Sequence, residues 1–242
     1  MTWYSSKDVS HCFLGLGSVA PYLNTVRLKT SATLTDTTGL GDTWREMSDT
    51  GLRTGELEFS GFYDGTSHGA YLNTVSDSDS VVSLFLEGNT AGKRFYGWRA
   101  ATVSSAEIGL SSDSVHTSAP GINVRGAVDF GYLVATYADR TTAGNTDATY
   151  VDLGASAASG RAYMRIGTPT LGGYDNIIVT VRHCDTSDGT YEDHTSFPAV
   201  TTATHSTLAL ATTINRYVSI SWAWTGAGTG QSATFFVGVA PV

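Results

Sequence analysis

The residues of this chain best suited to chemistry lie around His183, where histidine, cysteine and carboxylate side chains come close together in sequence. The run His183-Cys184-Asp185, with His194 further on, has the residue types of a zinc site. It lacks the paired two-residue spacing that zinc sites use. The acidic residues that follow can offer oxygen ligands to a hard cation, but they surround Asp188-Gly189, a common signal for a tight turn. We therefore predict a hairpin turn here and no metal site.

Glu56 and Glu58 form the best local pair of carboxylates for acid–base chemistry. In a strand, their spacing places both on one face, about 7 Å apart. Glycosidases use two carboxylates that flank the bond they hydrolyse. The polar face of an ordinary strand accounts for the same two residues, and this is the interpretation that we prefer.

The segment Gly15-Leu16-Gly17-Ser18-Val19-Ala20 formally fits a dinucleotide-binding fingerprint. That fingerprint works only where it opens a helix after a strand, and here Pro21 follows at once. A turn or a flexible arm is expected instead. Since no catalytic motif, cofactor site or phosphate loop stands out, we expect a protein that is not an enzyme.

The composition indicates many short strands and few charges. Only 15% of the 242 residues are charged, against about 25% in typical soluble domains, and Thr, Ser, Ala and Gly take their place. Thr favours strands, Gly and Ser mark turns, and low charge suits a surface that is hidden against partners. The net charge is −8. Without a basic stripe, sequence-specific binding of nucleic acid is not expected.

The sequence also carries signals about the compartment. Cys12 and Cys184 are far apart in a long chain, so we expect two reduced, partly buried thiols rather than a disulfide framework. The segment from Met1 to Leu23 has no basic leader followed by an apolar core, which predicts no signal peptide. No apolar run approaches the roughly 18 residues of a membrane span. We expect a soluble protein that starts life in a cytoplasm and has no membrane partner.

Alternation of apolar and polar residues dominates the chain and predicts strands. In Gly55–Asp64, for example, Leu57 and Phe59 fall on one face, and Glu56 and Glu58 on the other. One short helix is expected at Ser67–Asp77, from apolar residues at helical spacing. Further strands are expected at Val26–Asp36, Val81–Leu86, Arg94–Ser104, Asn123–Asp129, Tyr132–Tyr137, Ala162–Ile166, Asn176–His183, Thr207–Ala211, Tyr217–Trp224 and Ala233–Val239.

Two polar segments divide the chain. Thr37–Thr54 is a long connection with isolated apolar residues, and long loops of this kind are usually functional or disordered. Thr141–Thr149 is small and polar with no apolar anchor, which is typical of a linker. Five or six strands follow it and predict a small β-sandwich. The expected organisation is one domain at 1–140, a linker at 141–149 and a second domain at 150–242.

Two segments resemble tail proteins of long-tailed bacteriophages. Asp36 to Asp64 resembles the tail-tube pattern of an Asp-x-Thr-Gly-x-Gly-Asp turn, an Arg-Glu segment and a strand that ends in Gly, an aromatic residue and Asp. The matching residues are Asp36, Thr38, Gly39, Gly41, Asp42, Arg45, Gly51, Leu52, Gly61, Phe62 and Asp64. Asn176 to Pro241 resembles an accessory β-domain found at the C-terminus of some phage tail proteins. It matches at His183, Asp185, Asp188-Gly189, Phe197, Ala199-Val200-Thr201, Asn215-Arg216-Tyr217 and Ser232–Val239.

The resemblance implies a mainly β fold: a tail-tube β-sandwich or barrel with one short helix, followed by a small β-sandwich. It implies a structural virion subunit, assembled in the host cytoplasm into hexameric rings that stack into a tube, with other tail proteins at the tube ends. DNA would pass through an acidic lumen without specific binding. Residues 1–149 carry a net charge of −6, so Glu56 and Glu58 are our candidates to line that lumen. Asp42, Trp44, Arg45 and Leu52, in the long loop, are the candidates to contact the adjacent ring.

Two other functions fit the same composition. One is a capsid decoration protein, also a phage β-protein. The other is a carbohydrate-binding module or glycan hydrolase, because aromatic residues make up 11% of the chain and can form a sugar-binding platform. Trp222 and Trp224, however, lie in an alternating strand, where packing in the core is the usual fate of such rings.

Overall fold

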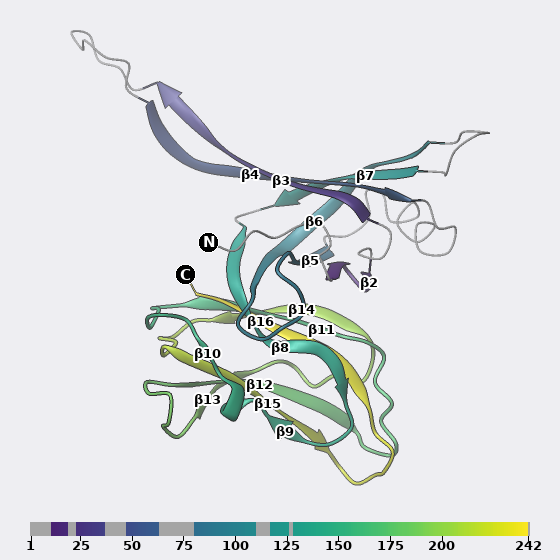
Figure 1. Cartoon of the computed structure of the whole chain (residues 1–242), viewed down its shortest axis with the longest axis vertical. Coiled ribbons are helices and arrows are strands. Elements are labelled where there is room, and N and C mark those ends of the chain that lie inside the picture. Colours follow the sequence, from purple (N-terminus) through teal and green to yellow (C-terminus); the bar gives the residue numbers. More distant parts are fainter. Residues whose placement is uncertain are drawn as a thin grey trace. The chain divides into compact units, whose positions relative to one another are not determined.

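The computed structural model describes residues 11–18, 23–36, 47–62, 80–109, 117–125 and 128–241 (Figure 1). Most of them lie in strands, and the one helix among these residues is a single 3-10 turn at Asp147–Thr149. The predicted mainly β fold is confirmed. The predicted helix at Ser67–Asp77 lies outside the described residues. No helix in the described part of the chain is long and apolar enough to cross a membrane.

The chain forms two compact units. Unit 1 comprises residues 1–21, 81–99 and 129–242, and unit 2 comprises residues 22–80 and 100–128. The predicted domains at 1–140 and 150–242 differ from this division, because long-range strand pairing brings early segments of the chain into the same unit as its C-terminal half.

Unit 2 is an antiparallel sheet of long strands. Its strand order is β3 (Leu23–Asp36), β4 (Met47–Phe62), β7 (Thr117–Arg125) and the later part of β6 (Arg94–Gly109). In the register, Leu28, Leu57, Ile122 and Val103 lie directly opposite one another across the four strands. Opposed residues share a face of the sheet. Leu57 and Ile122 are buried.

Unit 1 is a sandwich of two sheets, and the N-terminal strands lie at one end of the first sheet. The first sheet runs β14 (Thr204–Leu210), β11 (Gly160–Ile166), β16 (Ala233–Pro241), β8 (Asp129–Arg140), β6, β5 (Ser80–Phe85), β1 (His11–Leu14) and β2 (Gly17–Ser18). The second runs β10 (Val151–Asp152), β15 (Tyr217–Thr225), β12 (Asn176–Cys184) and β13 (Glu192–Ser196), with β9 (Gly144–Asn145) also on β15. Strands β8, β11, β14 and β16 of the first sheet share one core with β10, β12 and β15 of the second, so β8 from the N-terminal half packs with the C-terminal strands.

β16 is buried on both of its faces, which explains its almost continuous apolar sequence. Phe235, Val237 and Val239 lie in the core between the two sheets. Phe236 and Ala240, on the opposite face, lie in a second core with Phe13, Phe85 and Tyr163. Trp222 and Trp224 of β15 pack against the first core, as predicted, beside the buried Val218 and Ile220 of the same strand.

Three glycines let aromatic rings lie flat on the first sheet. A Cβ at Gly97 would stand 2.6 Å from Cζ of Tyr163, and a Cβ at Gly238 would stand 2.6 Å from Cε1 of Phe95. A Cβ at Gly131 would stand 2.5 Å from Cε1 of the same Phe95 ring. Such distances leave no room for any side chain, so these glycines are required by packing.

The predicted linker at Thr141–Thr149 is docked on the second sheet. Trp222 Nε1 donates to the Thr142 carbonyl at 2.6 Å, and the Thr146 N–H donates to the Ile220 carbonyl at 2.8 Å. Asp147 accepts from Ser219 Oγ at 2.6 Å and pairs with Arg182. The sequence contains no apolar anchor here, and the structure uses polar anchors in its place.

Candidate functional site

The two lumen candidates lie on β4, on either side of the buried Leu57 in sequence. In the register, Glu56 faces Lys29 of β3 and Glu58 faces Arg27. Arg27 Nη1 lies 3.5 Å from Glu58 Oε2, and the two side chains are 72% and 49% exposed. The predicted arrangement of Leu57 inside and Glu58 outside is therefore observed.

The β3–β4 register changes the expected charge of this face. It brings two cationic and two anionic residues together on neighbouring strands, and these four residues sum to zero. An exposed pair of this kind contributes only about 0–1 kcal/mol to stability, but the cations offset the field of the carboxylates. Alternation within β4 alone locates Glu56 and Glu58, whereas their charge partners become visible only once the pairing of β3 with β4 is known.

The proposed inter-ring residues divide into two groups. Asp42, Trp44 and Arg45 lie outside the described residues. Leu52 lies in β4, where the register steps from Ala32–Arg53 to Leu34–Asp49. It therefore belongs to an irregular step of the strand rather than to a loop. The expected connection at Thr37–Thr54 is shorter than predicted, because residues 47–54 belong to β4, where strand pairing overrides the low strand propensity of Asp and Gly.

His183 and His194 come together on β12 and β13, with ring centroids 4.8 Å apart. The Asn215 N–H donates to Nδ1 of His183 at 3.0 Å, so the neutral ring carries its hydrogen on Nε2. That tautomer leaves His183 no free nitrogen lone pair for a metal. Burial, and then the neighbouring His194, lower the pKa of His183. The described residues contain no group of His, Cys, Asp and Glu arranged to hold a metal ion.

A polar triplet holds the N-terminal hairpin, formed by β1 and β2 (His11–Ser18), in unit 1. His205 Nδ1 lies 2.7 Å from the Gly15 carbonyl oxygen, which can only accept, so Nδ1 carries the hydrogen. Nε2 of His205 then accepts from Ser83 Oγ at 3.0 Å. Burial lowers the pKa of His205 from 6.5 to about 3, so the ring is neutral at neutral pH.

Ser83, His205 and the Gly15 carbonyl have the order of a nucleophile, a base and an orienting group. Ser83 is fully buried, however, so a substrate cannot reach its hydroxyl in this structure. What the triplet does is fix the hairpin turn at Gly15, where φ is 54°. No local pattern in the sequence predicts this triplet, since its members lie far apart in the chain and share no motif.

Aromatic side chains and one arginine surround the same hairpin. The Phe13 ring stacks on Phe236 with centroids 5.4 Å apart, and Arg165 lies over Phe13 at 4.4 Å. Arg165 also donates to the Leu16 carbonyl at 2.5 Å and to Tyr137 Oη at 2.7 Å. We call the residues that receive the hairpin the socket: Ser83, Phe85, Tyr137, Arg165, His205 and Phe236.

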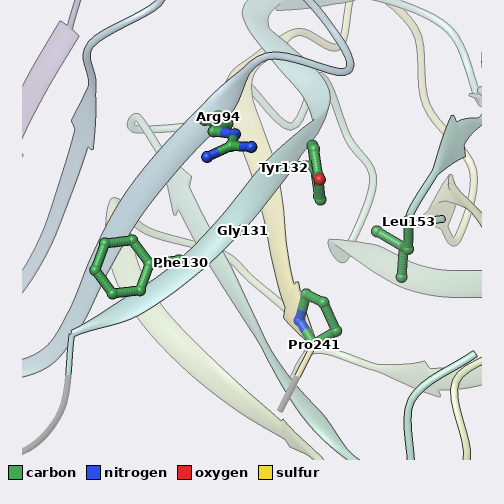
Figure 2. A pocket seen from close by; sticks show the side chains of 6 residues that line it. All are labelled: Arg94, Phe130, Gly131, Tyr132, Leu153 and Pro241. Carbon is green, nitrogen blue, oxygen red and sulfur yellow. The ribbon is translucent and has the colours of Figure 1, made fainter. Parts of the chain in front are cut away.

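The surface of unit 1 also has an open hollow of about 250 Å³, lined by Arg94, Phe130, Gly131, Tyr132, Leu153 and Pro241 (Figure 2). Phe130 is 60% exposed, and its ring meets Tyr96 edge-on at 5.2 Å. Ligand clefts usually measure about 300–1,000 Å³, so the hollow is small for a ligand. Exposed aromatic and arginine side chains are more typical of protein contacts.

Comparison with known proteins gives no family assignment: no family model and no curated protein matches the chain. Among solved structures, the chain is similar to one in the virion of a native gene transfer agent particle, with 16% identity, a TM-score of 0.45, and coverage of 53% of this chain and 98% of that one. The chain is also similar to one in the tail of the empty gene transfer agent particle, which has C6 symmetry. The identity is 14%, the TM-score is 0.43, and the match covers 53% of this chain and 98% of that one. A third similar structure is the Dit protein of phage SPP1, from a hub adsorption apparatus. The identity is 14%, the TM-score is 0.38, and the match covers 95% of this chain and 98% of that one. These TM-scores are too low to establish a shared fold.

Proposed function

We propose that this chain is a structural subunit of a phage tail tube that assembles with copies of itself. The observation that carries the proposal is the β3–β4 hairpin. The segment from Asp36 to Asp64, which resembles the tail-tube pattern, spans the end of β3 and the whole of β4. These strands have 14 and 16 residues, against about 5–6 in a usual strand.

β3 offers an edge for assembly. Among the described strands it pairs only with β4, which leaves a long row of backbone donors and acceptors on its other side. In a monomer such an edge is an aggregation hazard, and in an assembly it is a template for pairing with the next subunit. Arg27 and Lys29, which lie opposite Glu58 and Glu56 of β4, place charged groups along this strand that the next subunit must accommodate.

The tube itself follows from repetition. We propose hexameric rings that stack, with DNA passing through the lumen and other tail proteins at the ends. Repetition turns any unpaired charge into a ring of charge. Since Glu56 and Glu58 face Lys29 and Arg27, their contribution to an acidic lumen depends on whether assembly separates these pairs.

Sedimentation velocity over a range of protein concentrations tests self-assembly. The wild-type chain is expected to form large, concentration-dependent species. The double variant Arg27→Glu/Lys29→Glu should remain small, because it reverses the charge along the β3 edge. The matched control is Arg216→Glu, a change at an exposed arginine of unit 1 that pairs with Asp152, and it should assemble as the wild type does. A wild-type chain that stays monomeric at every concentration would refute the proposal.

A further inference from the structure

The N-terminal hairpin is held in unit 1 by non-covalent contacts with strands that lie far from it in sequence. The strand that follows it, β3, belongs to unit 2, and the chain returns to unit 1 only at β5. All the socket residues therefore come from residue 83 onward, on β5, β8, β11, β14 and β16. In sequence, the hairpin and its socket are separated by the whole of β3 and β4, although in space they are in contact.

The socket recognises the hairpin by both backbone and side chain. His205 donates a hydrogen bond to the Gly15 carbonyl, and Arg165 donates one to the Leu16 carbonyl. The Phe13 ring stacks on Phe236. β1 adds four residue pairs with β5, from His11–Phe85 to Leu14–Val82. These contacts define one occupant, the eight-residue hairpin His11–Ser18, and every copy of the chain carries both that hairpin and the socket.

We propose that the hairpin is exchanged between copies on assembly, so that His11–Ser18 of one subunit occupies the socket of its neighbour. This inference rests on the proposed self-assembly. Exchange of an identical element preserves every contact and is therefore a low-cost route to association. In an assembly the neighbour's socket is held at high effective concentration. The partner is a second copy of this chain, and each exchanged hairpin links two subunits.

The β1–β5 register supplies a direct test. Cys12 lies opposite Leu84, and opposed residues of antiparallel strands are about 4.5–5.5 Å apart at Cα, within the range for a disulfide. A reporter chain, Cys12→Ser/Leu84→Cys, has a thiol in its socket and none in its hairpin. Mixed with chains that have Cys12 and Leu84, it can form that bond only when the other chain's hairpin enters its socket. Cys184→Ser in every chain removes the one other thiol.

The two chains are mixed as subunits, concentrated, oxidised and separated on a non-reducing gel, and assembly is followed by sedimentation in the same samples. Exchange predicts a covalent species of twice the chain mass, formed only in the assembled fraction. As the control, Leu84→Cys alone, which retains Cys12, should form cross-chain multimers after assembly and a bond within one chain before it. Large assemblies without any cross-chain species, while this control closes within single chains, would overturn the exchange and leave the proposed function standing. Failure of the wild-type chain to assemble would overturn both.

A second readout does not depend on disulfide formation. Phe13→benzoylphenylalanine places a photoreactive ring beside Phe236, and isotopically light and heavy subunits are assembled together before irradiation. Exchange predicts that cross-linked peptides join light and heavy chains. Peptides that join only chains of one isotope would overturn the inference.

Discussion

Acid should weaken unit 1 through His205, and the structure gives the size of the effect. In the folded chain the ring is neutral: it donates to the Gly15 carbonyl, accepts from Ser83 and packs between Phe13 and Phe236. A proton on Nε2 would put a positive charge on a buried ring, and the nearby positive charge of Arg165 disfavours it further. The pKa of His205 is therefore about 3 in the folded state, against 6.5 for an unperturbed histidine.

The direction follows from which state takes the proton first. Because the folded pKa lies below the unfolded one, the unfolded chain binds the proton first as pH falls. Stability is fully present above the unfolded value and is lost as pH falls toward the folded one. With about 1.4 kcal/mol for each pKa unit, the His205 contribution to the loss between pH 7 and pH 4 is about 3 kcal/mol.

Urea unfolding of dilute subunits at a series of pH values measures this loss against a matched variant. His205→Gln retains a donor for Gly15 and an acceptor for Ser83 but cannot titrate in this range. Other groups, including His11 and His183, titrate in both proteins and cancel in the comparison. The free energy of unfolding of the wild type should fall by about 3 kcal/mol more than that of the variant between pH 7 and pH 4. Equal pH dependence in the two proteins would refute the assignment of the hairpin contact to a neutral His205.

Three further outcomes test other parts of the structure. Arg182→Ala removes the partner of Asp147 and Asp193 and should destabilise unit 1 by about 2–3 kcal/mol in urea unfolding; an unchanged midpoint would show that residues 141–149 are not anchored there. Gly97→Ala should cost about 1–3 kcal/mol through the clash with Tyr163, whereas Gly167→Ala, whose Cβ would lie 3.7 Å from its nearest neighbour, should be tolerated; equal effects would contradict the packing argument. Glu56→Lys/Glu58→Lys should still allow tubes but slow DNA ejection, more at low salt, and ejection at the wild-type rate would exclude these residues from the lumen wall.

Much of the strand content could be predicted from the sequence, because alternation is a local signal. β12, β15 and β16 begin at the predicted residues and extend beyond the predicted ends by one or two residues. β1 and β13 were not predicted. His11–Leu14 is only four residues long, and Glu192–Ser196 is polar, so both become strands through pairing with β5 and β12 rather than through their own sequence.

The site was harder to predict, because register and long-range pairing determine it. Alternation located Glu58 on the exposed face of its strand, but the facing Arg27 depends on how β3 pairs with β4. The sequence predicts a turn or a flexible arm at Gly15–Ala20, and the structure has a turn at Gly15-Leu16. The partners of that turn, His205 and Arg165, lie on strands far along the chain. A polar contact between distant strands leaves no periodic pattern in the sequence, so only the fold reveals it.

Electron microscopy of the concentrated, purified chain tests whether it forms a tail tube. We expect hollow tubes of stacked rings, with β3 at a contact between neighbouring subunits in their three-dimensional reconstruction. Particles that remain single subunits at high concentration, or that form no tubes and instead bind capsids as trimers, would contradict it.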